Sequence, residues 1–326
     1  NNQINLIKSD KYKIQPKAAK NEILSFLRKD LRDVSFSRDK SRLPWGIPVP
    51  GDKNQVMYVW ADALPNYITG IGYGSNSKKF KKWWPAQTHI IGKDISRFHA
   101  IYWPAMLLSA GLPTPKELWV HGFINDEKGR KMSKSLGNVI DPFDQINTYG
   151  LDTVRYYFLR SIPSNQDGNY SETDLIDRHN AELVNTLGNL LSRSLNLIEK
   201  SGGKVPAGNY DATLKKEYNQ ALKKLKESID NFEFHHGVAA VWKFIAKVNQ
   251  YVDKTKPWTL EGKKKDKVLY NLAESLRLIS AITYPIIPNA SEEIAKQIGL
   301  KKVPLIKSDS IKSGTKIKKG KHLFSK

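Results

Sequence analysis

The apolar residues beyond position 173 recur at helical spacing, and no other feature of the sequence constrains the fold as strongly. Four stripes follow one another over 176–198, 214–229, 238–252 and 268–279, and a short fifth follows over 291–298. Glycine or proline separates them, as at Gly202, Gly203 and Pro257. Each stripe provides one apolar helix face that must be buried against a neighbour. The second half of the chain is therefore predicted to be a helix bundle.

The first third of the chain shows a different pattern. Short apolar segments at 56–60, 89–92 and 117–121 are strand-like, a helical stretch spans 95–110, and an amphipathic helix over 21–32 precedes them. Alternating strands and helices at this spacing predict an α/β fold with a parallel sheet of Rossmann type. Ligands of such sheets bind at the carboxyl ends of the strands. The residues after each strand are therefore candidate ligand contacts.

Composition limits the possible partners. The 326 residues carry 53 Lys and Arg against 32 Asp and Glu, a formal charge of +21, which favours a polyanionic partner such as RNA. Solvated surface lysines in a lysine-rich chain account for the charge equally well. With no cysteine and no metal-ligand spacing among seven histidines, we expect no metal site. No apolar run approaches the roughly 20 residues of a membrane span.

The clearest chemical signal is the segment Lys131-Met132-Ser133-Lys134-Ser135. Two lysines and two hydroxyls lie close together between Gly129 and Gly137, and such a loop can fold over a phosphate chain. Its ammonium groups can then neutralise the charge that grows on leaving pyrophosphate. The lysine spacing alone would also fit a solvated basic turn.

The full string over 131–138 resembles the signature of the class I aminoacyl-tRNA synthetases. This resemblance implies that an amino acid is activated with ATP and Mg²⁺ as substrate and is then esterified to the 3′ end of a tRNA. It also implies that Lys131 and Lys134 act electrostatically at the ATP phosphates and that Ser133 assists by hydrogen bonding.

Two flanking segments narrow the resemblance to one amino acid. Residues 58–67 resemble the pocket motif of the methionyl enzymes, and residues 92–107 resemble their next conserved block. The enzymes for valine, isoleucine and cysteine carry nearly the same signature and remain alternatives. Aromatic and small apolar walls suit an unbranched, polarizable thioether, although Trp60 and Tyr67 would also fit an ordinary core. The resemblance implies methionine contacts at Trp60, Ala63, Leu64, Tyr67, Ile95, Phe98 and His99.

The nucleotide contacts are expected at two strand ends. Asp94 can accept hydrogen bonds from ribose hydroxyls and Lys93 can pair with a phosphate, or the two can form a local ion pair. The segment His121-Gly122 resembles the family segment that meets adenine through backbone groups. The predicted ATP contacts are Lys93, Asp94, His121, Gly122 and Lys134.

A polar helix face forms the predicted RNA-reading region. Asn185, Asn189 and Arg193 stand at four-residue intervals and share one face, which can hydrogen-bond exposed base edges. Trp258 can offer a stacking surface to an unstacked base. A solvated helix face and a packed tryptophan are the alternatives. Segments 180–193 and 251–258 resemble the methionyl anticodon-reading helix and its partner, which implies anticodon contacts with tRNA-Met at Asn189, Arg193 and Trp258.

The resemblance covers essentially the whole chain, but the chain does not cover the whole family pattern. No His-x-Gly-His signature occurs, since His89-Ile90-Ile91-Gly92 has the wrong order. We expect the C-terminal half of a Rossmann catalytic domain at 1–125, the signature loop and a stem-contact connector at 126–172, a helical anticodon-binding domain at 173–300, and an extended or loosely attached basic tail at 301–326.

One half of a two-part active site cannot be preorganised for catalysis on its own. We therefore expect this chain alone to activate methionine poorly or not at all, with an N-terminal half of the fold as candidate partner. A non-catalytic tRNA-binding fragment is the remaining alternative. The expected location is a bacterial-type cytoplasm or, alternatively, an organelle matrix.

Overall fold

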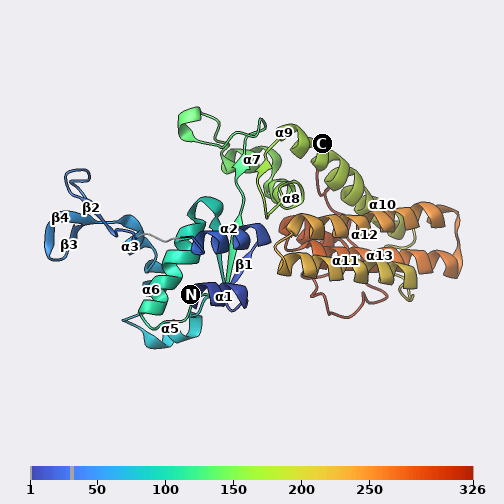
Figure 1. Ribbon diagram of the computed structural model, residues 1–326. Helices are drawn as coiled ribbons and strands as arrows, with labels where there is room; N and C mark the ends of the chain where they lie inside the picture. Colours follow the sequence, from blue (N-terminus) through green and yellow to red (C-terminus); the bar gives the residue numbers. More distant parts are fainter. Residues whose placement is uncertain (1, 30–32, 326) are drawn as a thin grey trace. The chain divides into compact units, whose positions relative to one another are not determined.

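The computed structural model describes residues 2–29 and 33–325 and divides into two compact units, Asn1–Phe123 and Ile124–Lys326. Figure 1 shows the helices and strands of each unit. In the first unit, α1 (Asn2–Lys8) and α2 (Lys17–Leu27) pack on the sheet. The helix predicted over 21–32 is α2, and residues 30–32 of that prediction lie outside the described residues.

A parallel sheet of three strands forms the core of the first unit. Its order is β1 (Lys13–Gln15), β6 (Glu117–His121), β5 (Thr88–Gly92). The predicted strands at 89–92 and 117–121 are confirmed, and they pair in parallel register from Thr88 opposite Glu117 to Gly92 opposite His121. The centre of β6 is buried over three consecutive residues, as expected for a parallel strand that is covered on both faces.

The prediction of a third parallel strand at 56–60 is wrong. Strand β4 (Asp52–Met57) instead pairs antiparallel with β2 (Ser37–Asp39) and β3 (Pro48–Val49) in a separate sheet. Val49 lies opposite Asp52, so two residues turn the chain, and Gly51 has a φ of 85°. A connection this short permits only antiparallel neighbours. The residues after Met57 form the helix α3 (Val59–Ala63), so Trp60 does not lie at the end of a parallel strand.

The helix predicted over 95–110 is divided into three parts. A 3₁₀ turn (Lys93–Ile95) leads to a π-helical turn (Phe98–Tyr102), and α6 (Trp103–Ser109) follows. Pro104 has no N–H to donate to the carbonyl group four residues before it. The N–H of Trp103 bonds instead to the carbonyl of Phe98, five residues back. The π-helical turn thus ends directly before the segment that contains the proline, where the regular ladder is interrupted. Two further short helices complete this unit, α4 (Asn66–Thr69) and α5 (Ser77–Trp83).

The second unit contains the predicted helix bundle. All five predicted stripes are helical and contribute to one buried cluster. The second unit begins with β7 (Ile124–Asn125), which pairs with β8 (Gly168–Asn169). Helices α7 (Pro142–Tyr149) and α8 (Leu151–Ser161) lie between these two strands in the sequence. Figure 1 shows α11, α12 and α13 running side by side. The bundle helices are α9 (Glu172–Arg178), α10 (Asn189–Glu199), α11 (Ala212–Asp230), α12 (Phe234–Thr255), α13 (Gly262–Thr283) and α14 (Pro288–Gln297).

The stripe over 176–198 contains an irregularity that its spacing does not reveal. Between α9 and α10 the helix is of π type over His179–Gly188. There the hydroxyl of Thr186 donates to the carbonyl of Ala181, five residues back, at 2.8 Å. Leu183 and Leu187 are nevertheless fully buried, so the apolar face continues through the wider turns.

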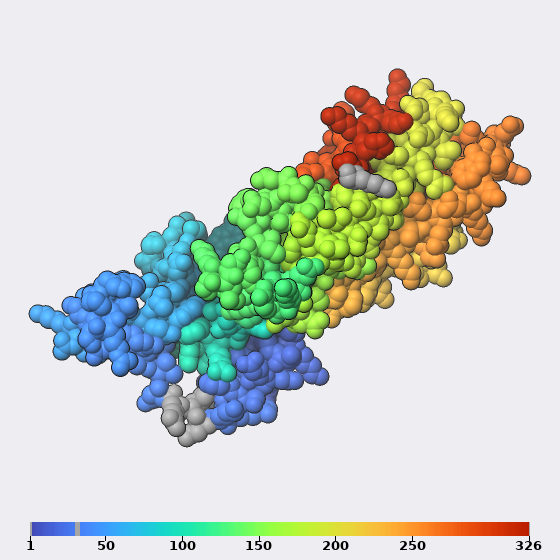
Figure 2. Space-filling view, turned by 90° about the horizontal axis from the view of Figure 1, so that it is seen from above, coloured from blue at the N-terminus to red at the C-terminus, as the bar shows by residue number. Residues whose placement is uncertain are grey.

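The C-terminal tail is extended, but the prediction of a loose attachment is wrong. Val205 N donates to Thr315 O, Ile317 N to Gly203 O and Lys318 N to Gln297 O, at 2.8 to 3.0 Å. Ile311 enters the hydrophobic core. In Figure 2 the end of the chain, in red, lies on the surface against the yellow-green segment, and His179 Nε2 is 2.8 Å from Ser325 O. These backbone pairings attach the tail without any helical periodicity.

Candidate functional site

Four of the predicted methionine contacts form one aromatic cluster in the first unit. The Trp60 and Phe98 rings stack with centroids 4.4 Å apart and an interplanar angle of 15°. The His99 ring forms T-shaped pairs with Trp60 and Tyr67, with ring centroids 6.0 Å and 5.6 Å apart. Helices α3 and α4 and the π-helical turn before α6 each contribute to this cluster. The structure therefore brings together residues that lie up to 39 positions apart in the sequence.

Hydrogen bonds fix the state of the histidine in this cluster. His99 Nδ1 lies 3.0 Å from Ile95 O, and Nε2 lies 2.9 Å from the Tyr67 hydroxyl. Burial lowers the pKa of His99, so the ring is neutral at pH 7. Because only a protonated Nδ1 can donate to a carbonyl, Nε2 accepts the hydroxyl proton of Tyr67. The result is an uncharged, aromatic wall that suits an apolar side chain.

The remaining predicted methionine contacts differ in exposure. Leu64 is fully buried and packs with Ile68, Trp84, Trp103 and Leu107, so it supports the cluster from the core. Ala63 is partly exposed at the end of α3, and Ile95 contributes its carbonyl to His99.

His89 belongs to this region and was missed as a site residue. Its ring lies 4.4 Å from the Tyr67 ring, and a cavity of about 370 Å³ adjoins both. In the part of the chain that the structure describes, His89 Nδ1 is buried without a hydrogen-bond partner. Burial and the neighbouring His99 lower the pKa of His89 to about 4. The sequence signal for His89 was a histidine within a predicted buried strand. It was considered only as part of a His-x-Gly-His signature, which the segment does not match.

Replacing His89 with Phe is expected to reduce the pH dependence of stability. The unfolded chain takes up a proton near pH 6.5 but the folded chain only near pH 4. Stability conferred by the neutral ring is therefore lost as the pH falls between these values. Between pH 7.5 and 5.0, His89 alone accounts for a loss of about 2 kcal/mol in the wild type. Urea unfolding followed by tryptophan fluorescence measures it, with His322→Phe as an exposed control. An equal pH dependence in His89→Phe would contradict this assignment.

Four of the five predicted ATP contacts, all but Lys134, lie at the carboxyl ends of two adjacent strands. Lys93 and Asp94 follow β5 directly and are exposed, and His121 ends β6. A side chain at Gly92 would come within 2.9 Å of Asp94 Oδ1 and 3.7 Å of His121 Cε1, so the two strand ends approach closely there. Lys93 Nζ lies 4.5 Å from the centre of the Phe123 ring. His121 Nδ1 is 3.0 Å from Gly122 O.

The signature loop lies in the second unit. Ser133 caps a single 3₁₀ turn (Lys134–Leu136), its Oγ accepting from Leu136 N at 3.3 Å. Lys134 is exposed at the start of this turn. Gly129 and Gly137 have φ values of 76° and 64°, a backbone conformation that favours glycine. The loop thus turns at two glycines, one on each side of the lysines.

A polar clasp closes this loop, and it was missed as well. Asp126 accepts from Lys128 N, Arg130 N and Arg130 Nε at 2.8 to 3.1 Å and from Asn138 Nδ2 at 3.0 Å. Asn138 Oδ1 in turn accepts from Ser133 N at 2.9 Å. These hydrogen bonds, that of Asn138 foremost, lower the pKa of Asp126 to about 2. An aspartate three residues before a glycine is a turn signal, but its partner across the loop is not apparent from sequence.

The predicted anticodon residues are accessible. Asn185 and Asn189 are exposed, and Arg193 Nη2 pairs with Asp253 Oδ1 at 2.7 Å. This pair joins α10 to the end of α12, five residues before Trp258. The Trp258 side chain is 56% exposed in the turn Pro257–Thr259, so the alternative of a packed tryptophan is wrong.

Residues 2–29 and 33–325 contain neither a metal-binding group of side chains nor a transmembrane helix. No group of three or more His, Asp or Glu in those ranges is arranged to hold a metal ion. Within the same ranges, no helix combines the length and the apolar content of a transmembrane span.

Comparisons with known proteins agree with this arrangement. A family model described as tRNA synthetases class I (M) matches residues 2–195, and one described as the anticodon-binding domain of tRNA ligase matches residues 211–321. The methionine–tRNA ligase of Caldanaerobacter subterraneus subsp. tengcongensis is 42% identical over 326 residues, covering 95% of this chain and 51% of that protein. The Brucella suis enzyme is 45% identical over 289 residues, covering 86% and 56%.

A solved structure is similar over nearly the whole chain. Mycobacterium tuberculosis methionyl-tRNA synthetase bound by methionyl-adenylate matches with a TM-score of 0.91 and 34% identity, covering 99% of this chain and 66% of that one. The chain spans about half the length of the curated relatives that it matches.

Proposed function

We propose, since this chain belongs to the class I methionyl-tRNA synthetase family, that it contributes to the ATP-dependent ligation of methionine to tRNA-Met. The observation that carries the proposal is the neutral aromatic cluster of Trp60, Tyr67, Phe98 and His99. Its stacked rings offer contacts to a polarizable thioether, and its uncharged imidazole offers no ion-pair partner to a charged side chain. The proposed methionine contacts are those four residues with Ala63 and Ile95, whereas the predicted contact Leu64 is fully buried and supports them from the core.

The nucleotide and the leaving group are assigned to two sets of residues. We propose that Mg²⁺–ATP contacts Lys93, Asp94, His121, Gly122 and Lys134. A carboxylate oxygen of methionine attacks the α-phosphorus, the bond to the β-phosphate oxygen breaks, and pyrophosphate leaves with the electron pair. Lys131 and Lys134 stabilise the charge on that group, and Ser133 assists by hydrogen bonding. The 3′ end of the tRNA then takes the methionyl group from the adenylate and releases AMP.

The proposed domain division keeps the expected boundaries. Residues 1–125 provide the second half of the nucleotide-binding fold, 126–172 the signature loop and stem contact, 173–300 the anticodon-binding domain and 301–326 the basic tail.

Strand β5 stands at an edge of its sheet, and Ile90 on it is exposed. An exposed strand edge can pair with a further strand, which supports the first half of the fold as partner.

The anticodon of tRNA-Met is assigned to the helical unit. Asn189 and Arg193 hydrogen-bond the base edges, and Trp258 stacks on a base. The exposure of Trp258 and Asn189 supports this assignment.

Because charging of tRNA accompanies translation, we propose the cytoplasm or an organelle matrix as location.

Reconstitution tests the catalytic part of the proposal. The first half of the nucleotide fold from a relative, added as a separate chain, is expected to restore methionine-dependent ATP–pyrophosphate exchange, whereas this chain alone has little or none. Valine, isoleucine and cysteine should support exchange poorly. Equal exchange with any of these would favour another class I enzyme. No exchange, combined with tRNA binding that weakens steeply with salt, would favour a tRNA-binding module.

A further inference from the structure

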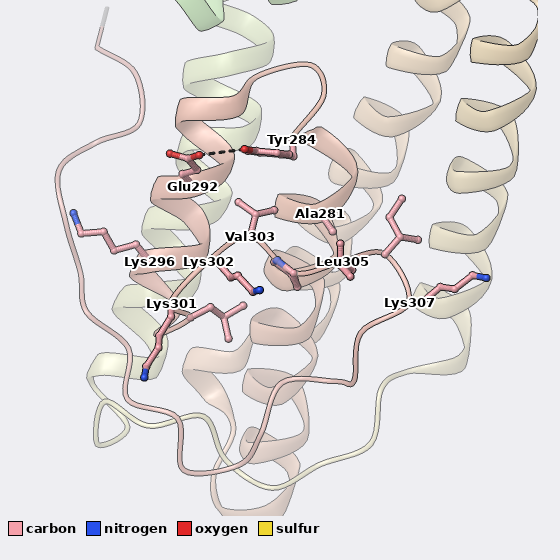
Figure 3. Close-up of a pocket in the computed structure, with 12 residues that line it drawn as sticks. Ala281, Tyr284, Glu292, Lys296, Lys301, Lys302, Val303, Leu305 and Lys307 are labelled. Carbon is pink, nitrogen blue, oxygen red and sulfur yellow. Dashed lines mark hydrogen bonds between the residues drawn. The ribbon is translucent and has the colours of Figure 1, made fainter. Parts of the chain in front are cut away.

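An apolar groove on the helical unit belongs to none of the sites described above. It has a volume of about 1000 Å³, and its lining includes Ala281 and Tyr284 near the end of α13 and Glu292 and Lys296 on α14. The segment 300–307 forms the opposite wall, as Figure 3 shows.

The wall of this groove is anchored on both sides. Leu300 N donates to Ala295 O at 2.9 Å, and Ile311 N donates to Glu274 Oε2 at 2.8 Å. Glu274 also forms a buried ion pair with Arg277 at 2.6 Å, and Arg277 Nη1 donates to Ser308 Oγ at 3.3 Å. Breaking a buried pair of this kind leaves an uncompensated charge. The segment is therefore held in place over the helices.

Large apolar side chains stand exposed along the groove. Leu305 is 79% exposed and Tyr284 is 43% exposed, and Ile306 is exposed beside them. Contiguous exposed apolar groups at a concave surface are typical of a binding site for another protein. Since Leu305 and Ile306 are aliphatic, they offer no stacking surface for nucleic-acid bases.

The charged residues at the rim of the groove indicate the sign of the charge that a partner should carry. Lys301, Lys302 and Lys307 border the groove, and Figure 3 shows Lys296 and Lys301 on the side opposite Lys307. Of the residues that line it in the described part of the chain, only Glu292 is acidic, and it accepts from the Tyr284 hydroxyl at 3.3 Å. A second copy of this chain, with its charge of +21, offers little acidic complement.

We propose that this groove docks an acidic amphipathic helix of a partner protein. Apolar side chains at three- and four-residue spacing would enter the groove against Leu305 and Ile306. Carboxylates on the flanks of the same helix would pair with Lys301, Lys302 and Lys307. This interaction is separate from catalysis and from anticodon reading.

Fluorescence anisotropy with a labelled peptide of about 18 residues tests the proposal. The peptide carries leucines on one helix face and glutamates on the flanks. Binding to the full chain is expected, with at least about tenfold loss in Leu305→Asp and in the double variant Lys301→Glu/Lys302→Glu. Both sites are exposed, so folding should be unaffected. The matched controls are Ile229→Asp and Lys215→Glu/Lys216→Glu on α11, which are expected to bind as the wild type does.

A second peptide with the same composition in scrambled order separates patterned docking from simple charge attraction. It should bind at least about tenfold more weakly. Four results would overturn the proposal: no binding of the patterned peptide, equal binding of the scrambled one, equal loss in the control variants, or displacement of the peptide by anionic vesicles or by tRNA at the same sites.

Discussion

Lys134→Ala is expected to lower methionine-dependent ATP–pyrophosphate exchange by about 10²- to 10³-fold in a protein that also holds the first half of the nucleotide fold. Lys134 is the first residue of the turn that Ser133 caps, so the backbone that carries its ammonium group is held by that turn. A charge held in place before the reaction stabilises leaving pyrophosphate more than a mobile charge does. The effect should appear mainly in the rate of adenylate formation.

The neighbouring Lys128 provides a matched control for Lys134. It is exposed in the same loop and carries the same charge. Lys128→Ala should keep exchange within about threefold of the wild type, because its charge lies outside the signature string. Thermal unfolding of both variants should match the wild type. Equal losses in the two variants would mean that general charge, and not the position of Lys134, drives the step.

Trp258→Ala is expected to weaken binding of a tRNA with a CAU anticodon by about 10- to 100-fold, the range for removing one stacked base contact. The side chain is largely exposed, so its removal should leave the bundle folded. Binding to this chain can be measured by fluorescence anisotropy at one fixed salt concentration, since phosphate contacts depend on salt.

Trp83→Ala is the matched control for Trp258. Trp83 is 57% exposed but lies on α5 in the first unit. Its removal should leave tRNA affinity unchanged. A tRNA with a different anticodon should lose much less affinity in Trp258→Ala than the CAU tRNA does. Equal loss for both tRNAs would contradict anticodon reading by Trp258.

The bundle could be predicted because its helices are long and periodic. α12 and α13 each span 22 residues, so the apolar stripe repeats several times. β1 has three residues and leaves no such pattern. β4 was predicted as a strand but assigned to the wrong sheet, since the pairing depends on the two-residue turn after Val49. Periodicity indicates which face of an element is buried, but it does not indicate which strands lie next to one another in a sheet.

The candidate site was predicted from motifs only in part. The signature string named Lys134 and the block over 92–107 named His99, but neither named Asp126 or His89. Both were missed because their roles depend on residues brought close by folding, such as Asn138 for Asp126. The π-helical stretch before α10 was missed since ten residues are too few to separate its period from that of an α-helix.

The clasp between Asp126 and Asn138 gives the signature loop a preferred resting state. If the loop closes over a nucleotide in a different shape, it moves between two populations, and ligand binding must supply the free energy that separates them. Weakening the hydrogen bonds between Asp126 and Asn138 would raise the population of the second loop shape without changing Lys131 or Lys134. Because the pKa of Asp126 is lowered to about 2, acidity in the physiological range does not protonate this clasp. A nucleotide that binds the second shape more tightly than the resting one would shift this equilibrium.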